Sequence, residues 1–383
     1  MFDSLVRFVR EQYGTQDFIP LHAPVFAGNE QKYLADTITS TFVSSVGGFV
    51  DRFEHDMQVY TGSARAVATV NGTAALHVAL LLAGVKPGEL VITQSLTFVA
   101  TCNAITYCGA QPVFIDVDLE TLGLSPVALE TWLEQKAVVG ADGVCRLLSD
   151  GRVLRACLPM HTFGHPVALD ELMAVCSRWG LTLVEDAAES LGSTYKGRHT
   201  GTFGLVGTLS FNGNKVITTG GGGMLLTNAE LGVRAKHLTT TAKQPHAFEY
   251  VHDEIGFNYR LPNLNAALGC AQLEQLDVFL AAKRQLAADY QRHLVGSDLQ
   301  FVVEPASCRS NYWLNAVICQ DREQRDALLG ATNGAGVMTR PIWALMNRLP
   351  AFKDCIRGDL SNAEWLEARV VNLPSSVPAR GVA

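Results

Sequence analysis

Seven short apolar runs, separated by segments with a helical spacing of apolar residues, form the main pattern of the chain. The runs are nearly continuous, which is typical of strands covered on both faces of a sheet. They cover Ala66–Val70, Leu90–Thr93, Pro112–Val117, Leu154–Met160, Leu181–Asp186, Val206–Phe211 and Met224–Thr227. The helices predicted between them cover Thr73–Ala83, Phe98–Tyr107, Pro126–Gln135 and Leu169–Trp179. This alternation predicts an α/β fold around a largely parallel sheet.

The character of the chain changes after Asn228. A long helical pattern covers Leu264–Leu280 and continues towards Tyr290. Beyond it the pattern predicts strands over Phe301–Val303 and Tyr312–Cys319 and helices over Arg322–Gly330 and Ala363–Val370. We therefore expect an N-terminal segment and large domain over residues 1–264, and the long helix with a smaller α+β domain over residues 265–383. Two further expectations are an amphipathic helix within Met1–Gly14 and a surface excursion over Ala137–Arg152.

Composition excludes several classes of protein. Of the 383 residues 48% are hydrophobic and 17% are charged, which provides a large core. A net charge of −7, with no block of Lys or Arg, argues against a nucleic-acid or anionic-membrane surface. Nine scattered cysteines without a C-x-x-C pair indicate free thiols in a reducing compartment and no zinc site. No segment reaches the roughly 18 apolar residues of a membrane span, so we expect a cytoplasmic protein.

A single lysine lies between two predicted strands in the segment Ser210–Gly223. Lys215 precedes four consecutive glycines, a run that allows positive φ angles and close approach of a ligand. A sheltered lysine has a lowered pKa and a lone pair suited to Schiff-base chemistry. On this segment alone, an exposed loop lysine beside a flexible linker is equally compatible.

Two other strand ends carry candidate site residues. In Val70–Leu76, Gly72 and Thr73 begin a helix, whose free N–H groups can hold a phosphate, although Thr73 as a simple N-cap also fits. In Glu185–Glu189, carboxylates follow an apolar strand at the edge of the sheet where ligands bind. A buried Asp186 needs a partner such as the protonated ring nitrogen of a pyridine cofactor, or it caps the next helix.

Four residues have weaker signals. His161 and His165 follow one predicted strand without a third metal ligand, so His161 is a positioned polar group or a substrate contact. Phe98 fits the core or a stacking contact with a flat ring. Arg260 fits phosphate recognition or a solvated loop.

Together these segments resemble the DegT/DnrJ/EryC1/StrS family of sugar aminotransferases, in the expected order and from about Ile19 to Ser376. The resemblance implies the fold of aspartate aminotransferase (pyridoxal phosphate fold type I), with a mostly parallel seven-stranded sheet. Within the family the chain is most similar to the LegC-type enzymes, which aminate C4 of a UDP-linked 4-keto-6-deoxy-N-acetylhexosamine. The segments behind this similarity are Phe18–His22, Phe42–Gly47, Asn212–Lys215, Thr339–Trp343 and Asn372–Ser376.

The resemblance also implies roles for individual residues. Lys215 would carry pyridoxal 5'-phosphate as an internal aldimine and move protons, and Asp186 would pair with the pyridinium nitrogen. Gly72, Thr73 and Ser210 would hold the phosphate, and Phe98 would stack on the ring. Two sets complete the expected site: Glu189 and Asn258 as cofactor contacts, and His161, Arg340 and Trp343 as substrate contacts.

Two positions depart from the family pattern, and a third is expected to act beyond its own chain. Glu189 falls where relatives often carry Gln or His near the ring hydroxyl, and Gly221 replaces the Glu of a common Thr-Gly-Glu-Gly-Gly motif. Asn258 would reach the phosphate of the neighbouring subunit, which makes a homodimer with shared active sites necessary.

The sequence therefore predicts an aminotransferase that moves an amino group from L-glutamate to a UDP-linked keto-sugar in bacterial surface glycan biosynthesis. The alternatives are a nucleotide-sugar dehydratase of the same fold, which would carry His in place of Lys215, and a non-catalytic ligand-binding or regulatory protein.

Overall fold

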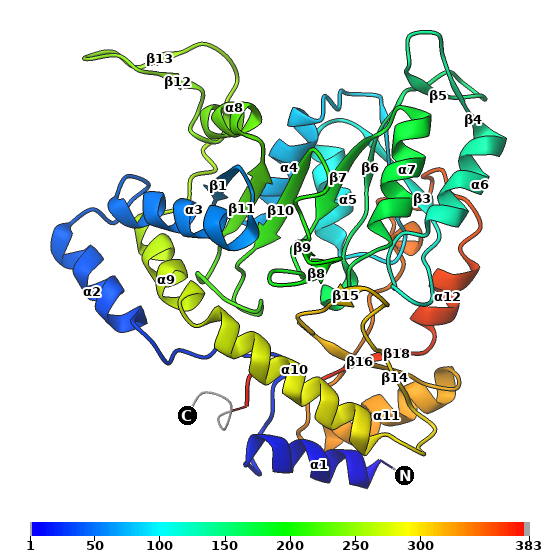
Figure 1. Cartoon of the computed structure of the whole chain (residues 1–383). Helices are drawn as coiled ribbons and strands as arrows, with labels where there is room; N and C mark the ends of the chain where they lie inside the picture. Colours follow the sequence, from blue (N-terminus) through cyan, green and yellow to red (C-terminus); the bar gives the residue numbers. More distant parts are fainter. Residues whose placement is uncertain (1, 379–383) are drawn as a thin grey trace.

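A seven-stranded sheet forms the centre of the molecule in a computed structural model, which describes residues 2–378 (Figure 1). The strand order is β1-β11-β10-β7-β6-β2-β3. The strands cover Arg65–Thr69 (β1), Leu90–Gln94 (β2), Gln111–Ile115 (β3), Leu154–Leu158 (β6), Thr182–Asp186 (β7), Val206–Ser210 (β10) and Gly223–Thr227 (β11). All seven predicted strands therefore belong to one sheet, and the predicted α/β fold is confirmed.

The sheet is parallel except at β11. This strand pairs antiparallel with both β1 and β10, whereas β10, β7, β6, β2 and β3 pair in parallel. The carboxyl ends of the parallel strands meet at one edge, together with the end of β1 and the start of β11. The loops at this edge carry the candidate site residues predicted from the sequence.

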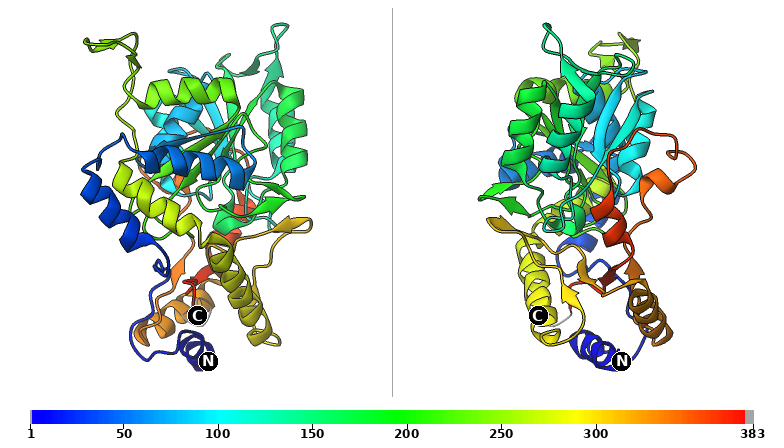
Figure 2. Two further views of the ribbon diagram at one scale, coloured as in Figure 1. Left: turned by 60° about the vertical axis from the view of Figure 1, so that its left-hand side comes forward. Right: turned by 90° about the vertical axis from the view of Figure 1, so that its right-hand side faces the viewer.

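Helices cover both faces of the sheet (Figure 2). One face packs against α4 (Gly72–Leu82), α5 (Val99–Tyr107) and α8 (Ala229–Thr239). The other packs against α3 (Gly48–Thr61), α6 (Pro126–Lys136), α7 (Leu169–Trp179) and α9 (Asn263–Leu273). Because both faces are covered, the strands are buried along nearly their whole length, as the continuous apolar runs predict.

Local capping explains where several of these helices begin. The side chains of Asn71, Ser125 and Asn228 each accept a hydrogen bond from an N–H group in the first turn of α4, α6 and α8. Pro126 at the first position of α6 adds a fixed φ. The predicted surface excursion is a hairpin of β4 (Ala137–Val139) and β5 (Cys145–Leu147).

A smaller four-stranded antiparallel sheet lies beside the large one, in the order β14-β16-β18-β17. Its strands cover Gln300–Phe301 (β14), Asn315–Ile318 (β16), Arg340–Pro341 (β17) and Val370–Leu373 (β18). The helices of this region are α10 (Leu276–His293), α11 (Arg322–Gly334) and α12 (Ser361–Glu367). The predicted helix over Ala363–Val370 is therefore wrong at its end, because Val370 begins strand β18.

The predicted long helix is broken into α9 and α10. At the break the N–H of Gln275 donates to Gln272 O at 3.1 Å, three residues back, so the α-helical bonding is interrupted. The Glu274 carboxylate accepts hydrogen bonds from Tyr33 and Arg52 at 2.7 and 2.6 Å. These partners lie far away in the sequence, so the helical pattern alone does not reveal the break.

The N-terminal helix α1 (Asp3–Tyr13) packs on α10, far along the chain (Figure 1). Phe8 and Val9 of α1 contact the cluster that contains Leu286 and Tyr290 of α10. The domain boundary at residue 264 stays a prediction; Met1 and the last five residues of the second predicted domain lie outside the described residues. Within residues 2–378, no helix has both the length and the apolar character that crossing a membrane requires.

Candidate active site

A cavity of about 290 Å³ opens at the edge of the sheet where the predicted site residues lie. It is lined by segments that follow β1, β7 and β10, and by residues of the smaller region. Eight of the predicted residues line it: Gly72, Thr73, Phe98, Asp186, Glu189, Ser210, Lys215 and Trp343. The fold thus brings together, in one cavity, residues that are up to 271 positions apart in the sequence, from Gly72 to Trp343.

The loop that carries Lys215 is closed by its own backbone. The N–H of Phe211 donates to Gly222 O at 2.8 Å, and the N–H of Thr219 donates back to Phe211 O at 3.0 Å. The Lys215 N–H donates to Asn212 O at 3.0 Å, which forms a tight turn directly before the lysine. Lys215 is therefore held at a defined place, and its side chain is only 13% exposed. The exposed-loop alternative does not fit this burial.

Lys215 lies between an indole ring and a carboxylate. Its Nζ lies 3.8 Å from the centroid of the Trp313 ring, a distance at which the ring face attracts a cation. The Trp313 Nε1–H donates to Asn214 O at 2.6 Å, beside the lysine. On the other side, Nζ lies 3.5 Å from Oε1 of Glu189.

The four glycines after the lysine differ in whether, and why, the structure requires glycine at their positions. Gly220 has a φ of +80°, which favours glycine. A Cβ on Gly222 would overlap Thr219 Oγ1, and a Cβ on Gly223 would overlap the backbone of Asn71. Gly221 differs: a Cβ there would have Val70 O at 3.9 Å as its nearest neighbour, and Gly221 lines the cavity. Backbone conformation therefore favours glycine at position 220, packing requires it at 222 and 223, and neither requires it at 221.

The first turn of α4 forms the predicted anion cradle. Asn71, not Thr73, caps this helix, with its Oδ1 accepting from the N–H of Ala74 at 2.8 Å. A Cβ on Gly72 would lie 2.9 Å from the Cβ of Ser210, so glycine permits this close approach of the two segments. The N–H groups of the helix start and the Ser210 hydroxyl thus line one end of the cavity, an arrangement suited to a phosphate.

Asp186 lies at the end of β7 and is buried. Its Oδ2 accepts from the Thr101 hydroxyl at 2.7 Å and its Oδ1 from the N–H of Ala188 at 3.2 Å. Burial raises the pKa of this carboxyl, and these hydrogen bonds offset only part of the rise. A carboxylate in this position gains most from a cation in the cavity, such as a protonated ring nitrogen. The bond from the N–H of Ala188 does not make Asp186 a helix cap, because no helix follows it directly.

Glu189 is buried, and each of its two carboxylate oxygens contacts a different residue. Oε2 accepts from the N–H of Phe163 at 2.9 Å, and Oε1 faces Lys215. Phe163 adopts a positive φ of 57°, unusual for a residue other than glycine. Burial raises the pKa of Glu189 to about 7, although Lys215 opposes the rise. This carboxyl can therefore hold or release a proton beside the lysine near neutral pH.

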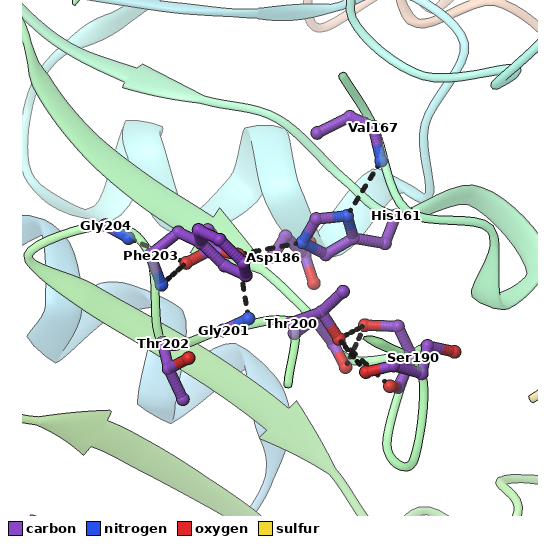
Figure 3. A network of polar contacts seen from close by, with 12 residues as sticks. His161, Val167, Asp186, Ser190, Thr200, Gly201, Thr202, Phe203 and Gly204 are labelled. Carbon is purple, nitrogen blue, oxygen red and sulfur yellow. Dashed lines mark hydrogen bonds and ion pairs between the residues drawn. The ribbon is translucent and has the colours of Figure 1, made fainter. Parts of the chain in front are cut away.

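His161 is fully buried and does not line the cavity; it belongs to a network of polar contacts within the fold (Figure 3). Its Nδ1 accepts from the N–H of Val167 at 3.2 Å, so the proton of the neutral ring is on Nε2, which lies 3.1 Å from Oε2 of Glu185. The Glu185 carboxylate also accepts from the N–H groups of Gly201, Phe203 and Gly204, each at 2.7 Å. Both ring nitrogens of His161 are thus used within the fold, so this placement does not favour the predicted substrate contact.

The remaining predicted residues fall in three places. Trp343 lines the cavity near Phe98, with ring centroids 6.4 Å apart. Arg340 is exposed on β17 and does not line the cavity. Asn258 is also exposed and accepts from the guanidinium of Arg260 at 2.9 and 3.0 Å. This placement away from the chain's own cavity is compatible with the predicted role of Asn258 towards a neighbouring subunit.

Sequence reasoning missed Trp313 and three asparagines that line the cavity, Asn71, Asn212 and Asn214. Asn212 and Asn214 belong to the segment Asn212–Lys215, which carries the LegC-type similarity, but neither is predicted as a cavity residue. Trp313 is 98 positions from the lysine and follows no strand end of the large sheet, so nothing near it in the sequence indicates its role.

The donor set of the cavity fits pyridoxal phosphate. The cradle at the start of α4 and Ser210 suits a phosphate, and the buried Asp186 suits a ring cation. Lys215 is the amine that lies within this set, and Phe98 provides an aromatic side wall. The three functional groups of the cofactor thus have matching partners on three different segments.

Comparisons with known proteins agree with this geometry. The sequence profile of the DegT/DnrJ/EryC1/StrS aminotransferase family matches residues 25–379. The chain is 38% identical over 336 residues to EpsN of Bacillus subtilis (strain 168), whose name assigns it provisionally to the pyridoxal phosphate-dependent aminotransferases; the match covers 87% of this chain and 84% of EpsN. It is 35% identical over 359 residues to GDP-perosamine synthase of Escherichia coli O157:H7, covering 94% and 93% of the two chains.

Among solved structures, the aminotransferase TlmJ of Streptoalloteichus hindustanus superposes with a TM-score of 0.84 at 28% identity. The match covers 94% of this chain and 93% of TlmJ. The chain therefore belongs to the DegT/DnrJ/EryC1/StrS aminotransferase family, and the predicted family, fold and enzyme class, a pyridoxal phosphate-dependent sugar aminotransferase, are confirmed. The LegC-type subgroup stays a prediction.

Proposed function

We propose that this aminotransferase takes the amino group of L-glutamate and transfers it to C4 of a nucleotide-linked 4-keto-6-deoxy sugar, with pyridoxal phosphate bound covalently to Lys215. The observation that carries the proposal is the convergence of Lys215, Asp186 and the cradle at Gly72 in one cavity. The family resemblance implies that Lys215 carries the cofactor, that Asp186 pairs with its ring nitrogen and that the cradle holds its phosphate.

Each residue has a distinct task in this proposal. The N–H groups of Gly72 and Thr73, with the Ser210 hydroxyl, bind the phosphate. Asp186 keeps the ring nitrogen protonated, and when bound the cofactor withdraws electrons from the carbon that bears the migrating amino group. Lys215 then carries the proton to and from that carbon, which its place on a closed loop allows it to do reproducibly.

The acceptor is proposed to be a UDP-linked 4-keto-6-deoxy-N-acetylhexosamine. The support is the sequence similarity in segments such as Asn212–Lys215, whose asparagines line the cavity. A GDP-linked 4-keto-6-deoxyhexose is the competing acceptor, because curated relatives at 34–35% identity are named GDP-perosamine synthase. The cavity wall of Trp343 and Phe98 offers flat apolar surfaces for either sugar.

We further propose that the active unit is a homodimer. The segment between α8 and α9 extends from the body as a hairpin of β12 (Lys243–Gln244) and β13 (Val251–His252) (Figure 1). Along it Phe248, Tyr250 and Ile255 are 92%, 81% and 85% exposed. An arm with such exposed apolar residues is typical of a protein interface, and it ends close to Asn258.

The first experiment is the visible absorption spectrum of the purified protein loaded with pyridoxal phosphate. We expect a visible band from the lysine-linked cofactor, which L-glutamate removes and the correct keto-sugar restores. Return of the band with the UDP-linked acceptor but not with the GDP-linked one supports the proposed acceptor, and the reverse result corrects it. If glutamate leaves the band unchanged, the proposed donor is wrong.

The shared site is tested by mixing two inactive variants, Lys215→Ala and Asn258→Ala. If the sites are shared, an equal mixture regains up to about a quarter of the wild-type activity on subunit exchange. About half of the dimers are then mixed, and each mixed dimer has one of its two sites built from both intact residues. Mixtures that stay inactive while forming mixed dimers contradict a shared site. The cytoplasmic location expected from the sequence stays a prediction.

A further inference from the structure

A second lysine, Lys283 on α10, is buried in the smaller region, where it is 1% exposed. Its Nζ lies 3.0 Å from His22 Nε2 and donates to Trp313 O at 3.2 Å and to Ser375 O at 2.5 Å. These three acceptors come from the N-terminal segment, the segment just before β16 and the segment just after β18. A single ammonium group therefore joins three parts of the chain that are far apart in the sequence.

Among residues 2–378, which the structure describes, this lysine has no acidic partner. None of the ion pairs within the described residues involves Lys283, and the charged or titratable groups that influence its neighbour His22 are the two lysines, 283 and 215. Burial lowers the pKa of Lys283 to about 7. Burying an ammonium group without a carboxylate costs free energy, and a buried apolar side chain of similar length avoids that cost. Such a residue indicates a requirement other than packing.

The three contacts lead directly to the active-site lysine. Trp313 is the residue that touches both lysines: its backbone O accepts from Lys283, and its ring face lies against Nζ of Lys215. The same indole donates to Asn214 O, in the turn that precedes Lys215. The position of the Trp313 backbone therefore sets where the ring lies, and the ring forms one wall of the Lys215 environment.

We propose that Lys283 is a positioning residue of the active site, which fixes Trp313 and thereby the orientation of Lys215. The inference rests on the proposed function in one respect, namely that Lys215 is the reacting amine. Lys283 itself does not line the cavity and has no contact with the reacting atoms. Its effect passes through the indole ring.

The test is a double-mutant cycle with Lys283→Met and Trp313→Phe. We expect Lys283→Met to lower kcat for amino transfer by about tenfold or more, with the KM for L-glutamate changed less than about threefold. In the Trp313→Phe background the same change is expected to lower kcat by less than about threefold, because the ring contact it controls has already changed. Effects that multiply independently overturn the proposal. If Lys283→Met does not fold, Lys283→Gln, which keeps a hydrogen-bond donor, replaces it in the same cycle.

Tyr290→Phe is the matched control. Tyr290 lies on the same helix, is fully buried, and donates through its hydroxyl to Pro374 O at 3.0 Å, one residue from Ser375. It ties α10 to the same C-terminal segment without touching Trp313. We expect this variant to lower Tm but to leave kcat unchanged. If Tyr290→Phe lowers kcat as much as Lys283→Met, the role of Lys283 is general stabilisation, and the proposal fails.

A readout without the reaction separates this inference from the proposed function. In protein labelled with 5-fluorotryptophan, the Trp313 ¹⁹F resonance is identified by its absence in Trp313→Phe. We expect that resonance to shift in Lys283→Met and to keep its position in Tyr290→Phe. An unchanged resonance in Lys283→Met overturns the positioning role even if the enzyme is active. A shifted resonance in a protein that transfers no amino group supports the positioning and contradicts only the proposed function.

Discussion

Strand β7 ends in two consecutive carboxylates whose environments are opposite. Glu185 points to one face, where His161 and three backbone N–H groups surround it, and Asp186 points to the other face, into the cavity with two hydrogen bonds. Burial alone would raise the pKa of both carboxyl groups. At Glu185 the surrounding donors outweigh burial and the pKa is lowered, whereas at Asp186 burial prevails and the pKa is raised. Adjacent residues of a strand thus differ because side chains alternate between faces.

The difference shows how a buried polar group can be assigned to structure or to chemistry. The Glu185 carboxylate has a complete set of donors from the fold itself, so it holds the segment 201–204 against β7 (Figure 3). The carboxylates of Asp186 and Glu189 have fewer donors from the fold than Glu185 has, and both line the cavity, where a bound ligand would add partners. A full set of donors within the fold indicates a structural role, and a raised pKa at a cavity wall indicates a functional one.

Of the changes to cavity residues, removing the amine of Lys215 should have the largest effect on activity. Lys215→Ala is expected to lower kcat by about 10⁴-fold or more, because both the covalent link and the proton carrier are lost. Tm should change little, and absorbance of the lysine-linked cofactor should be absent. Turnover near the wild-type rate would place the reacting amine elsewhere.

The paired variants Asp186→Asn and Glu185→Gln test the contrast directly. Asp186→Asn is expected to lower kcat by about 10²- to 10³-fold, because the ring cation loses its partner, with little loss of stability. Glu185→Gln should lower the free energy of unfolding by about 3 kcal/mol or more, because its amide leaves buried N–H donors unpaired.

Activity per folded molecule should survive in Glu185→Gln, measured as kcat after correction for the folded fraction. Unfolding in denaturant measures the stability of both variants. The contrast fails if Glu185→Gln loses kcat as strongly as Asp186→Asn at equal folded fraction.

Glu189 predicts a pH dependence with a definite sign. Its pKa of about 7 in the folded chain lies above its ordinary value of 4.5, so the folded state keeps a proton that the unfolded chain has released. The wild type should therefore lose stability relative to Glu189→Gln as pH rises from about 4.5 to about 7, by at most about 3 kcal/mol. The difference in free energy of unfolding between the two cofactor-free proteins at pH 5 and pH 8 measures it. A difference independent of pH contradicts the raised pKa.

Substitutions in the glycine run should have the smallest effects on stability. They compare a closely packed position, Gly222, with an open one, Gly221. Gly222→Ala should lower stability by about 1–3 kcal/mol, because its Cβ overlaps Thr219 Oγ1. Gly221→Ala should change stability by less than about 0.5 kcal/mol, because its Cβ enters open space. Thermal unfolding of the two variants compares them, and equal losses would show that the space beside Gly221 is not open.

The sequence alone predicts the large sheet and most of the cavity, for one physical reason. Strands buried on both faces appear as continuous apolar runs, and the residues just after them must meet at one edge. This is why Gly72, Asp186 and Lys215 could be selected together from separate segments. The family resemblance then assigned them roles that no single segment establishes.

Other features depend on partners that are distant in the sequence. His161 has the same position after a strand as Asp186 has, and only the structure shows that Val167 and Glu185 use both of its nitrogens. The contacts of Trp313 with Asn214 and Lys215, and the contact of Glu274 with Arg52 at the break before α10, join segments more than 90 residues apart. The local sequence pattern does not indicate such contacts.

The contact between residues 13–21 and residues 374–376, beside α10, has a consequence for synthesis of the protein. Ser375 N–H donates to Leu21 O, and the Tyr13 hydroxyl donates to Ser376 O, so the first and last segments hold each other. A chain growing from its N-terminus must leave Tyr13 and Leu21 without these partners until Ser375 and Ser376 have been added. The large sheet can assemble before that point in translation, whereas this corner, and with it the wall behind Lys215, can close only once Ser375 and Ser376 have left the ribosome. A polypeptide that stops short of these residues would thus bring the cavity residues together without the contacts that hold Trp313 behind Lys215.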